Sequence, residues 1–241
     1  MFEKVRLRTP FFETGVKNYI YGDAVLDYAR IMDEAAARYD IDVLFIAPYT
    51  EIRRVAENTK HLIVLAPYMD TLYPGRGIAD VLPEAILAAG ARGVVINHCE
   101  RPMTLPQIVR TIARANELGL LTFACADSIA ETRALAQLRP DIINPEPTEL
   151  IGSGQSSDMR YVTETLQIIR SISRDILVEQ AAGIISGQQC YDFIMAGNDA
   201  VGASSGILKS ADPARLADEM VASVKRAARD LARIARGAER S

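Results

Sequence analysis

Several features that would assign a class of protein at once are absent from these 241 residues. The three cysteines are widely spaced and form no C-x-x-C pair, so neither a zinc motif nor a redox motif is indicated. There is no run of eighteen uncharged apolar residues and no basic segment followed by an apolar one at the start, so neither a membrane span nor a signal peptide is predicted. We expect a soluble, cytoplasmic protein with no membrane partner.

The sequence also lacks an excess of positive charge. Its 27 lysine and arginine residues face 31 aspartate and glutamate residues, which gives a formal net charge of −4. General binding to nucleic acid needs a positive field, so nucleic acid is not an expected partner. No nucleotide-binding glycine fingerprint, metal-ligand cluster or Schiff-base context for a lysine is found, and we therefore expect no cofactor and no metal.

What the sequence does contain is a series of short β-branched runs, each followed by a loop and a segment of helical period. Seven of them are DVLFIAPY, LIVLAPY, GVVINH, LTFACAD, DIINPEP, ILVEQAAG and DAVGASSG, and a poorer run around TGVKNYIY makes eight. Several are nearly continuous apolar stretches, which is typical of parallel strands covered on both faces. With no linker-like change of composition, this pattern predicts an α/β fold, a single (β/α)8 barrel domain over residues 1–241.

Two helices have recognisable ends. Thr104 and Gln107 have the spacing of a capping box, and Gly119 is a candidate stop, so a helix is predicted between them. Asp212 as a cap and Pro213 at the first helical position predict the start of the last helix.

Polar residues stand where several predicted strands end, which is where a barrel of this kind carries its chemistry. Lys17 follows the first strand, His98 and Glu100 follow the fourth, and Glu146 ends the sixth. A carboxylate base, a neutral imidazole and a lysine suit proton abstraction next to a carbonyl group, because the imidazole and the ammonium stabilise the developing oxyanion. Each residue alone also has a purely structural interpretation, so the prediction depends on their occurring together.

The ends of strands seven and eight are small and rich in glycine. The segments are Ala181-Ala182-Gly183 and Ser204-Ser205-Gly206. Such ends leave backbone N–H groups free, and barrels hold phosphate in this way, although the glycines could simply allow tight turns. Together with the polar residues, they predict an isomerase that acts on a small phosphorylated carbonyl compound.

Beyond this pattern, the sequence resembles the triosephosphate isomerase family, in particular its shorter archaeal-type members. The resemblance covers most of the chain from residue 40 onward. The segments that carry it are DVLPEAILAAGARGVVINH and the following CE, PEPTELIGSG at Pro145 to Gly154, QAAGI at Gln180 to Ile184, and ASSGILKSADP at Ala203 to Pro213. The NH-x-E and EP-x-x-x-IG-x-G elements, in this order, are the most specific.

The resemblance implies roles for four residues. Glu146 matches the family's catalytic base, His98 matches its electrophile, and Lys17 matches the lysine that stabilises the enediolate. Glu100 matches the acidic residue that accompanies the histidine motif and would neighbour the lysine. The family is itself a well-known example of a glutamate base that works with a neutral histidine under a water-excluding loop.

The resemblance further implies a lid and a phosphate site. Residues 147–155 look like the closing lid, which would protect an intermediate that loses phosphate in water. Gly152, Ser205 and Gly206 would face the phosphate through backbone groups. It implies a small phosphorylated sugar as substrate and a homodimer or homotetramer as the assembly, since residues 74–77 resemble the start of the family's intersubunit loop.

The sequence departs from the family pattern at two places that concern the substrate. Gly15 stands where the family has an asparagine that hydrogen bonds the substrate oxygen, and loss of one such donor costs about a hundredfold in rate. Glu179 and Gln180 stand where members are apolar or small, and Ile185 replaces a serine that often contacts phosphate. Gln180 could therefore reach an additional substrate hydroxyl.

Three functions follow from these observations. The first is interconversion of glyceraldehyde 3-phosphate and dihydroxyacetone phosphate, an aldose-ketose isomerisation of glycolysis. The second keeps this chemistry and changes the substrate to another small phosphosugar such as a tetrulose phosphate, as Gly15 and Gln180 suggest. The third is a non-catalytic barrel that binds a phosphorylated metabolite, which the presence of both His98 and Glu146 disfavours.

Overall fold

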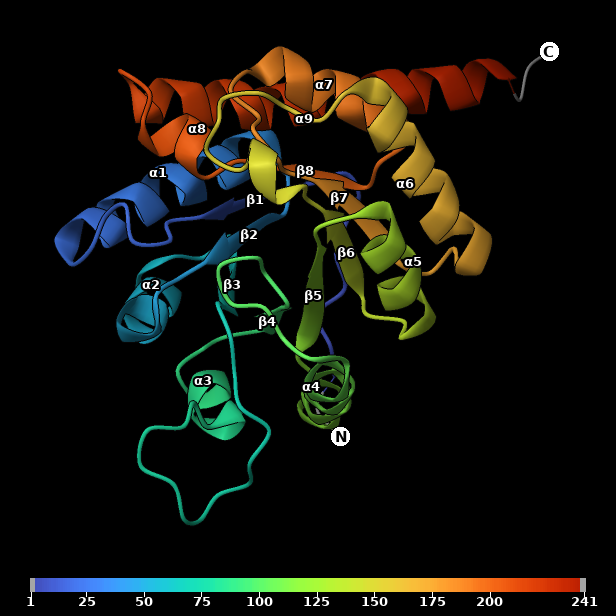
Figure 1. The fold of residues 1–241 in the computed structure, drawn as a ribbon. Coiled ribbons are helices and arrows are strands. Elements are labelled where there is room, and N and C mark those ends of the chain that lie inside the picture. The colour runs from blue at the N-terminus through green and yellow to red at the C-terminus, as the bar shows by residue number, and fades with distance from the viewer. Residues whose placement is uncertain (1–2, 239–241) are drawn as a thin grey trace.

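A computed structural model describes residues 3–238. Eight parallel strands pair in chain order, and the last pairs with the first, so that the sheet closes into a barrel (Figure 1). The strands are β1 (Phe11–Gly15), β2 (Val43–Ile46), β3 (Leu62–Ala66), β4 (Gly93–Ile96), β5 (Leu121–Ala126), β6 (Ile142–Pro145), β7 (Leu177–Gln180) and β8 (Ala200–Gly202). The prediction of a (β/α)8 barrel is confirmed.

The helices follow the strands and lie around the outside of the barrel (Figure 1). They are α1 (Asp23–Tyr39), α2 (Ile52–Asn58), α3 (Pro83–Ala88), α4 (Leu105–Leu118), α5 (Ile129–Gln137), α6 (Met159–Ile172), α7 (Gly187–Met195), α8 (Ser205–Leu208) and α9 (Pro213–Ala238), with short 3-10 turns η1 (Tyr49–Glu51) and η2 (Thr148–Leu150). Within residues 3–238, none of them has the length and apolar character needed to cross a membrane.

All three predicted helix ends are confirmed. Thr104 and Gln107 form the two reciprocal bonds of a capping box at the start of α4. Gly119 ends that helix in the left-handed conformation, with φ of 68°, which glycine adopts at little cost. At the start of α9, the carboxylate of Asp212 accepts a hydrogen bond from the N–H of Arg215 at 3.0 Å.

The apolar core has two layers, because successive side chains of a strand point to opposite faces. The larger layer lies between strands and helices, and the smaller one is made by side chains from the strands alone. The buried members of this smaller cluster are Phe11, Leu44, Leu65, Val95, Phe123, Cys125, Ile142 and Ala200. It fills the barrel interior, and the residues that follow it toward the carboxyl ends of the strands form the base of the pocket described below.

The first strand lies earlier in the chain than the sequence pattern predicts. Of the run TGVKNYIY, only Thr14 and Gly15 belong to β1, and the segment around Lys17 is a turn. Phe11 and Phe12 explain the difference, since both are fully buried, one inside the barrel and one in the layer beneath the helices. Burial of two aromatic side chains on opposite faces stabilises this register more than the mixed residues after Gly15 would.

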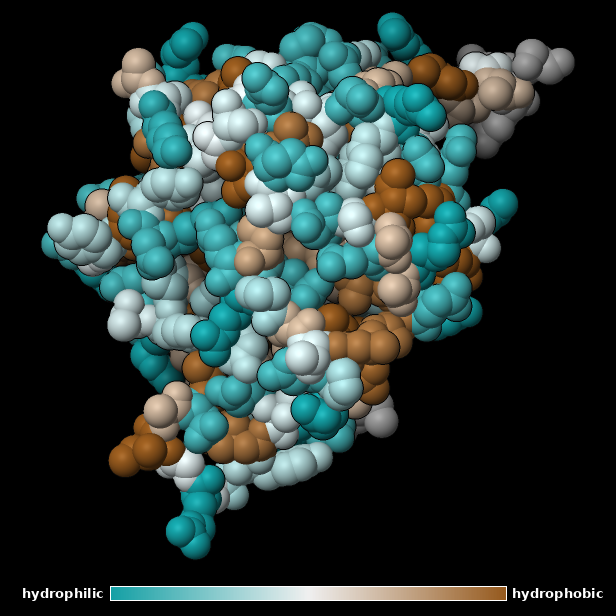
Figure 2. All heavy atoms as spheres, in the orientation of Figure 1, coloured by the Kyte–Doolittle hydropathy of each residue, from teal (hydrophilic) through white to brown (hydrophobic). Residues whose placement is uncertain are grey.

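The connection from β3 to α3 is long and projects from the barrel (Figure 1). Its base is closed by Asp70, whose carboxylate accepts the N–H of Val81 at 2.7 Å. Tyr73 and Ile78 on the projecting part are 61% and 103% exposed. Figure 2, in the same orientation, shows apolar side chains on this projection.

Candidate active site

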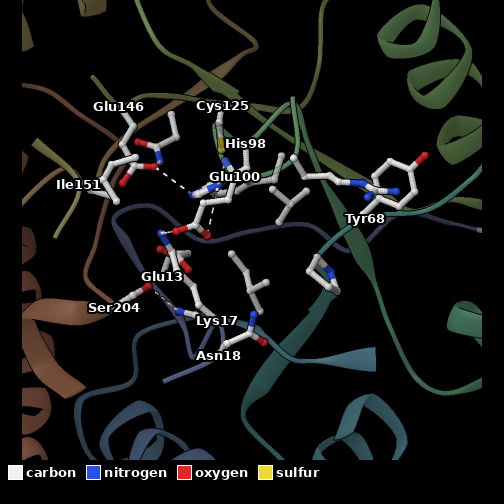
Figure 3. Close-up of a pocket in the computed structure, with 18 of the residues that line it drawn as sticks. Glu13, Lys17, Asn18, Tyr68, His98, Glu100, Cys125, Glu146, Ile151 and Ser204 are labelled. Carbon is white, nitrogen blue, oxygen red and sulfur yellow. Dashed lines mark hydrogen bonds and ion pairs between the residues drawn. The ribbon is translucent and has the colours of Figure 1, made fainter. Parts of the chain in front are cut away.

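A cavity of about 440 Å³ opens at the carboxyl ends of the strands, a size within the range of small-molecule sites. It gathers most of the residues that the sequence pattern selects, and Figure 3 shows several of their side chains directed into it. The selected residues that line it are Lys17, His98, Glu100, Glu146, Gly152, Gly183, Ser205 and Gly206. Residues as far apart in the chain as Lys17 and Gly206 thus meet in one pocket.

His98 and Glu146 face each other across the pocket (Figure 3). Nε2 of the histidine lies 3.6 Å from Oε2 of the glutamate. The other ring nitrogen, Nδ1, accepts a hydrogen bond from the backbone N–H of Glu100 at 3.1 Å. In a neutral imidazole only one nitrogen carries hydrogen, so this bond assigns the proton to Nε2 and directs the donor at the cavity.

The environment keeps His98 neutral. Its burial, followed by the positive charge of Lys17, lowers the pKa of the imidazole to about 4, although the charge of Glu100 acts in the opposite direction. At neutral pH, His98 therefore presents a neutral N–H donor to the pocket.

Glu146 is held directly after β6. Its backbone N–H donates to the carbonyl of Ala126 at 2.8 Å, and the side-chain amide of Asn144 donates to its Oε2 at 3.4 Å. The side chain is only 11% exposed. Burial raises the pKa of this carboxyl group to about 7, and Lys17 limits the increase. Glu146 is thus a stronger base than an ordinary carboxylate and still ionises near neutral pH.

Lys17 supplies the positive charge of the pocket. It stands in the turn after β1 with φ of 46°, a left-handed conformation that is uncommon for a residue with a side chain. Its Nζ lies 3.3 Å from Oε1 of Glu100. Burial lowers the pKa of the lysine, but the charges of Glu146 and Glu100 outweigh this and raise it above its ordinary value, so the ammonium remains charged.

The opposite end of the pocket is built from tightly packed backbone. A side chain at Gly183, where φ is 66°, would overlap the carbonyl of Gln155, and a side chain at Gly206 would overlap the carbonyl of Ile184. The hydroxyl of Ser204 accepts the N–H of Gly15 at 3.2 Å and joins the ends of β1 and β8. Glycine at these positions lets the chain segments around the pocket pack closely against one another.

The segment after Glu146 is a 3-10 turn, η2, followed by further turns. Its start is fixed where the N–H of Thr148 donates to the carboxylate of Asp127 at 2.7 Å. Gly152 and Gly154 have positive φ of 71° and 74°, conformations in which glycine avoids the strain of a side chain. Among these residues, Gly152 lines the pocket.

A family model described as triosephosphate isomerase matches residues 14–190. The chain belongs to the triosephosphate isomerase family. It is 32% identical to the triosephosphate isomerase of Methanobacterium bryantii over 221 residues, which are 90% of this chain and 97% of the relative. It is also 31% identical over 218 residues to that of Methanosarcina mazei, with 88% and 98% covered, and 30% identical over 204 residues to that of Sulfurisphaera tokodaii, with 83% and 88% covered.

Within this member of the triosephosphate isomerase family, Gln180 lies outside the pocket. It is buried, and its side-chain amide donates to the hydroxyl of Thr165 on α6 at 3.2 Å. Strand alternation explains this position, since Gln180 points to the helices and its neighbour Glu179 points into the barrel. The structure does not bring Gln180 together with the other selected residues.

Several pocket residues were missed by reasoning from the sequence, and Glu13 is one of them. Glu13 of β1 lines the cavity and is 4% exposed. The available signal was a charged residue within the buried strand FFETG. It was not used because the first strand was predicted later in the chain, around TGVKNYIY. In residues 3–238, no three histidine, cysteine, aspartate or glutamate side chains are grouped in a way that could hold a metal ion.

Proposed function

We propose that the protein interconverts glyceraldehyde 3-phosphate and dihydroxyacetone phosphate through an enediolate. The observation that carries this proposal is the buried carboxylate of Glu146 lying 3.6 Å from the proton-bearing Nε2 of a neutral His98. Membership of the triosephosphate isomerase family supports the same chemistry.

In the proposed mechanism, Glu146 moves the proton. Its carboxylate removes a proton from the carbon next to the substrate carbonyl and returns it to the former carbonyl carbon. The hydroxyl proton moves to the former carbonyl oxygen, so that the carbonyl and hydroxyl groups exchange places. The burial that raises its pKa to about 7 makes this transfer easier than it would be for an exposed glutamate, because the base is closer in strength to the operating pH.

The negative charge of the enediolate needs stabilisation as it develops on oxygen. The Nε2–H of His98 donates a hydrogen bond to that oxygen, and the ammonium of Lys17 adds a positive charge. Both groups are held in place before substrate binds, the first by the N–H of Glu100 and the second by its carboxylate. A fixed arrangement of this kind needs little reorganisation in the transition state.

The glycine-rich side of the pocket would hold the phosphate group. Backbone N–H groups of Gly152, Gly183, Ser205 and Gly206 are the proposed donors, and all four residues line the cavity. The lid, residues 147–155, would close over the bound substrate. Closure excludes water, which would otherwise promote loss of phosphate from the intermediate.

The test is turnover of glyceraldehyde 3-phosphate, together with exchange of the substrate's α-proton into solvent. We expect both in the unaltered protein, with a loss of about a hundredfold to ten-thousandfold in Glu146→Gln. Glu164→Gln is the matched control, because Glu164 is exposed on α6. Phosphosugar binding without any proton exchange would instead identify a non-catalytic barrel.

A second candidate keeps the mechanism and changes the substrate to a four-carbon ketose phosphate. The missing side chain at Gly15, which lines the pocket, favours it by opening space beside the reacting groups. Comparison of kcat/KM for glyceraldehyde 3-phosphate and erythrulose phosphates separates the two candidates. A strong preference for the three-carbon substrate would exclude the second.

We also propose that the protein self-associates as a homodimer or homotetramer through the projecting loop, residues 67–82. The exposed apolar side chains of Tyr73 and Ile78 support this, because such groups gain free energy when they are covered. Light scattering after size exclusion should give a mass of two or four chains, and Ile78→Asp should lower it. A monomer mass at all concentrations would contradict the proposal.

A further inference from the structure

Two carboxyl groups meet inside the barrel beneath the pocket. Glu13 follows Phe11 by two positions on β1, and Glu179 follows Leu177 by two positions on β7, so both point into the interior. Glu13 is 4% exposed and Glu179 is fully buried. Of the two, only Glu13 lines the cavity (Figure 3).

Gly202 of β8 makes room for this pair. Strand β8 pairs with β1 on one side and β7 on the other, and Gly202 lies opposite Glu13 in the ladder. A side chain at Gly202 would overlap Oε2 of Glu13 and come within 2.5 Å of Oε1 of Glu179. The missing side chain thus creates the space in which the two carboxyl groups meet.

Burial favours the protonated, uncharged form of both carboxyl groups. Neither oxygen of Glu179 has a hydrogen-bond partner among the described residues, and the point where a Cβ atom at Gly202 would stand lies 2.4 Å from Oε2 of Glu13 and 2.5 Å from Oε1 of Glu179. Burial, followed by the neighbouring carboxylates, raises the pKa of both groups. A protonated Glu179 in this position is a hydrogen-bond donor for Glu13.

The two oxygens of Glu13 face different ways. Oε2 lies on the side of Gly202 and Glu179, whereas Oε1 lies 3.5 Å from the point where a Cβ atom at Gly15 would stand. Gly15 lines the same cavity. Because Gly15 has no side chain, nothing from that position covers Oε1, and the carboxyl group is open to a ligand in the pocket.

We propose that Glu13, oriented by Glu179, is a further substrate-binding residue whose carboxyl group hydrogen bonds an oxygen on the carbon chain of the substrate. Glu13 lies two residues before Gly15 on the same face of β1, and it makes the contact with the substrate that Gly15, which has no side chain, cannot make. The ligand class is a hydroxyl-bearing phosphate monoester. This inference takes its ligand class from the proposed function, but it does not require that the protein catalyses isomerisation.

The test uses two unreactive ligands that differ only in hydroxyl groups, sn-glycerol 3-phosphate and n-propyl phosphate. Calorimetric titration should show that the unaltered protein binds the hydroxyl-bearing ligand more tightly, by about threefold to tenfold for one hydrogen bond. Glu13→Met has nearly the same size and no polar group, and its preference for the hydroxyl-bearing ligand should be smaller by that factor, because only the contacts of His98 and Lys17 with the hydroxyl groups remain. Glu13→Gln keeps a donor and an acceptor and should retain the preference.

Two results would overturn the proposal: equal affinities in the unaltered protein, or a preference in Glu13→Met that is as large as in the unaltered protein. If Glu13→Met does not fold, infrared difference spectra of the unaltered protein decide the question. The band of the protonated carboxyl group should shift with glycerol 3-phosphate and not with propyl phosphate, and an unshifted band would reject the contact.

The outcome is independent of turnover. A protein that fails to isomerise any phosphosugar can still show the hydroxyl preference, which would leave Glu13 as a binding residue and reject the proposed function. An active isomerase without the preference would reject the role of Glu13 alone.

Discussion

Nε2 of His98 lies 3.6 Å from Oε2 of Glu146, and the two groups are tuned in opposite directions by the same burial. Desolvation disfavours the charged form of each, so the pKa of the histidine falls to about 4 and that of the glutamate rises to about 7. Both are therefore held close to the protonation states that a neutral donor and an ionisable base require.

This relationship predicts the pH profile. Because Glu146 acts as the ionised base, kcat/KM should rise about tenfold per pH unit below its pKa of about 7 and level off above it. His98, with a pKa of about 4, should add no inflection near neutrality. In Glu100→Gln the rising limb should move to lower pH, since Glu100 raises the pKa of Glu146. A rising limb that moves to higher pH in this variant would contradict the assignment of Glu146 as the base.

Removal of the imidazole should slow turnover without unfolding the protein. His98→Gln loses the Nε2–H that faces the pocket, and loss of one oxyanion donor costs about a hundredfold to a thousandfold in kcat. His61→Gln is a matched control, because His61 is exposed before β3 and bonds only through its backbone. Equal kcat values for the two variants would remove His98 from the mechanism.

Lys17→Met tests the electrostatic coupling within the pocket. The ammonium lowers the pKa of Glu146 and that of His98, so its removal should raise both. The rising limb of the pH profile should move to higher pH, and NMR titration of the ring should show the pKa of His98 closer to its ordinary value. Unchanged values in the variant would mean that Lys17 lies farther from both groups.

Gly183→Ala should destabilise the fold and disturb the lid. The residue has φ of 66°, and an added methyl group would overlap the carbonyl of Gln155. We expect a loss of about 1–3 kcal/mol in the free energy of unfolding and a higher KM. Gly237→Ala is the control, since open space surrounds that position in α9 and alanine favours a helix by about 1 kcal/mol. An unchanged free energy of unfolding and an unchanged KM in Gly183→Ala would show that the lid packs differently.

The buried pair should make stability depend on pH. The pKa of Glu13 rises from 4.5 to about 8 on folding, so the folded state binds the extra proton between those values. The stability that this proton contributes is fully present below pH 4.5 and is lost as the pH rises through about 8. The slope is at most about 1.4 kcal/mol per pH unit for each proton. Urea denaturation should show a smaller slope in Glu13→Gln, and an unaltered slope would indicate that Glu13 stays ionised.

Much of the architecture could be predicted from local signals. Seven of the eight strands could be found because fully covered parallel strands are continuous apolar runs, and α4 could be delimited because its capping box and terminal glycine lie within the helix itself. The position of β1 could not, because FFETG contains a glutamate and the competing run TGVKNYIY has several β-formers. Only burial of Phe11 and Phe12 in separate layers decides the register.

The sequence by itself determined the barrel and the side chains that stand at its strand ends, since strand length, apolar pattern and caps are local properties of the chain. The tertiary structure decided which of those side chains share a cavity. Strand alternation turns Gln180 toward Thr165 and Glu179 toward Glu13, and closure of β8 against β1 brings Gly202 to the place where the two carboxyl groups meet. Those relationships depend on register and closure, which are set by packing across the whole barrel.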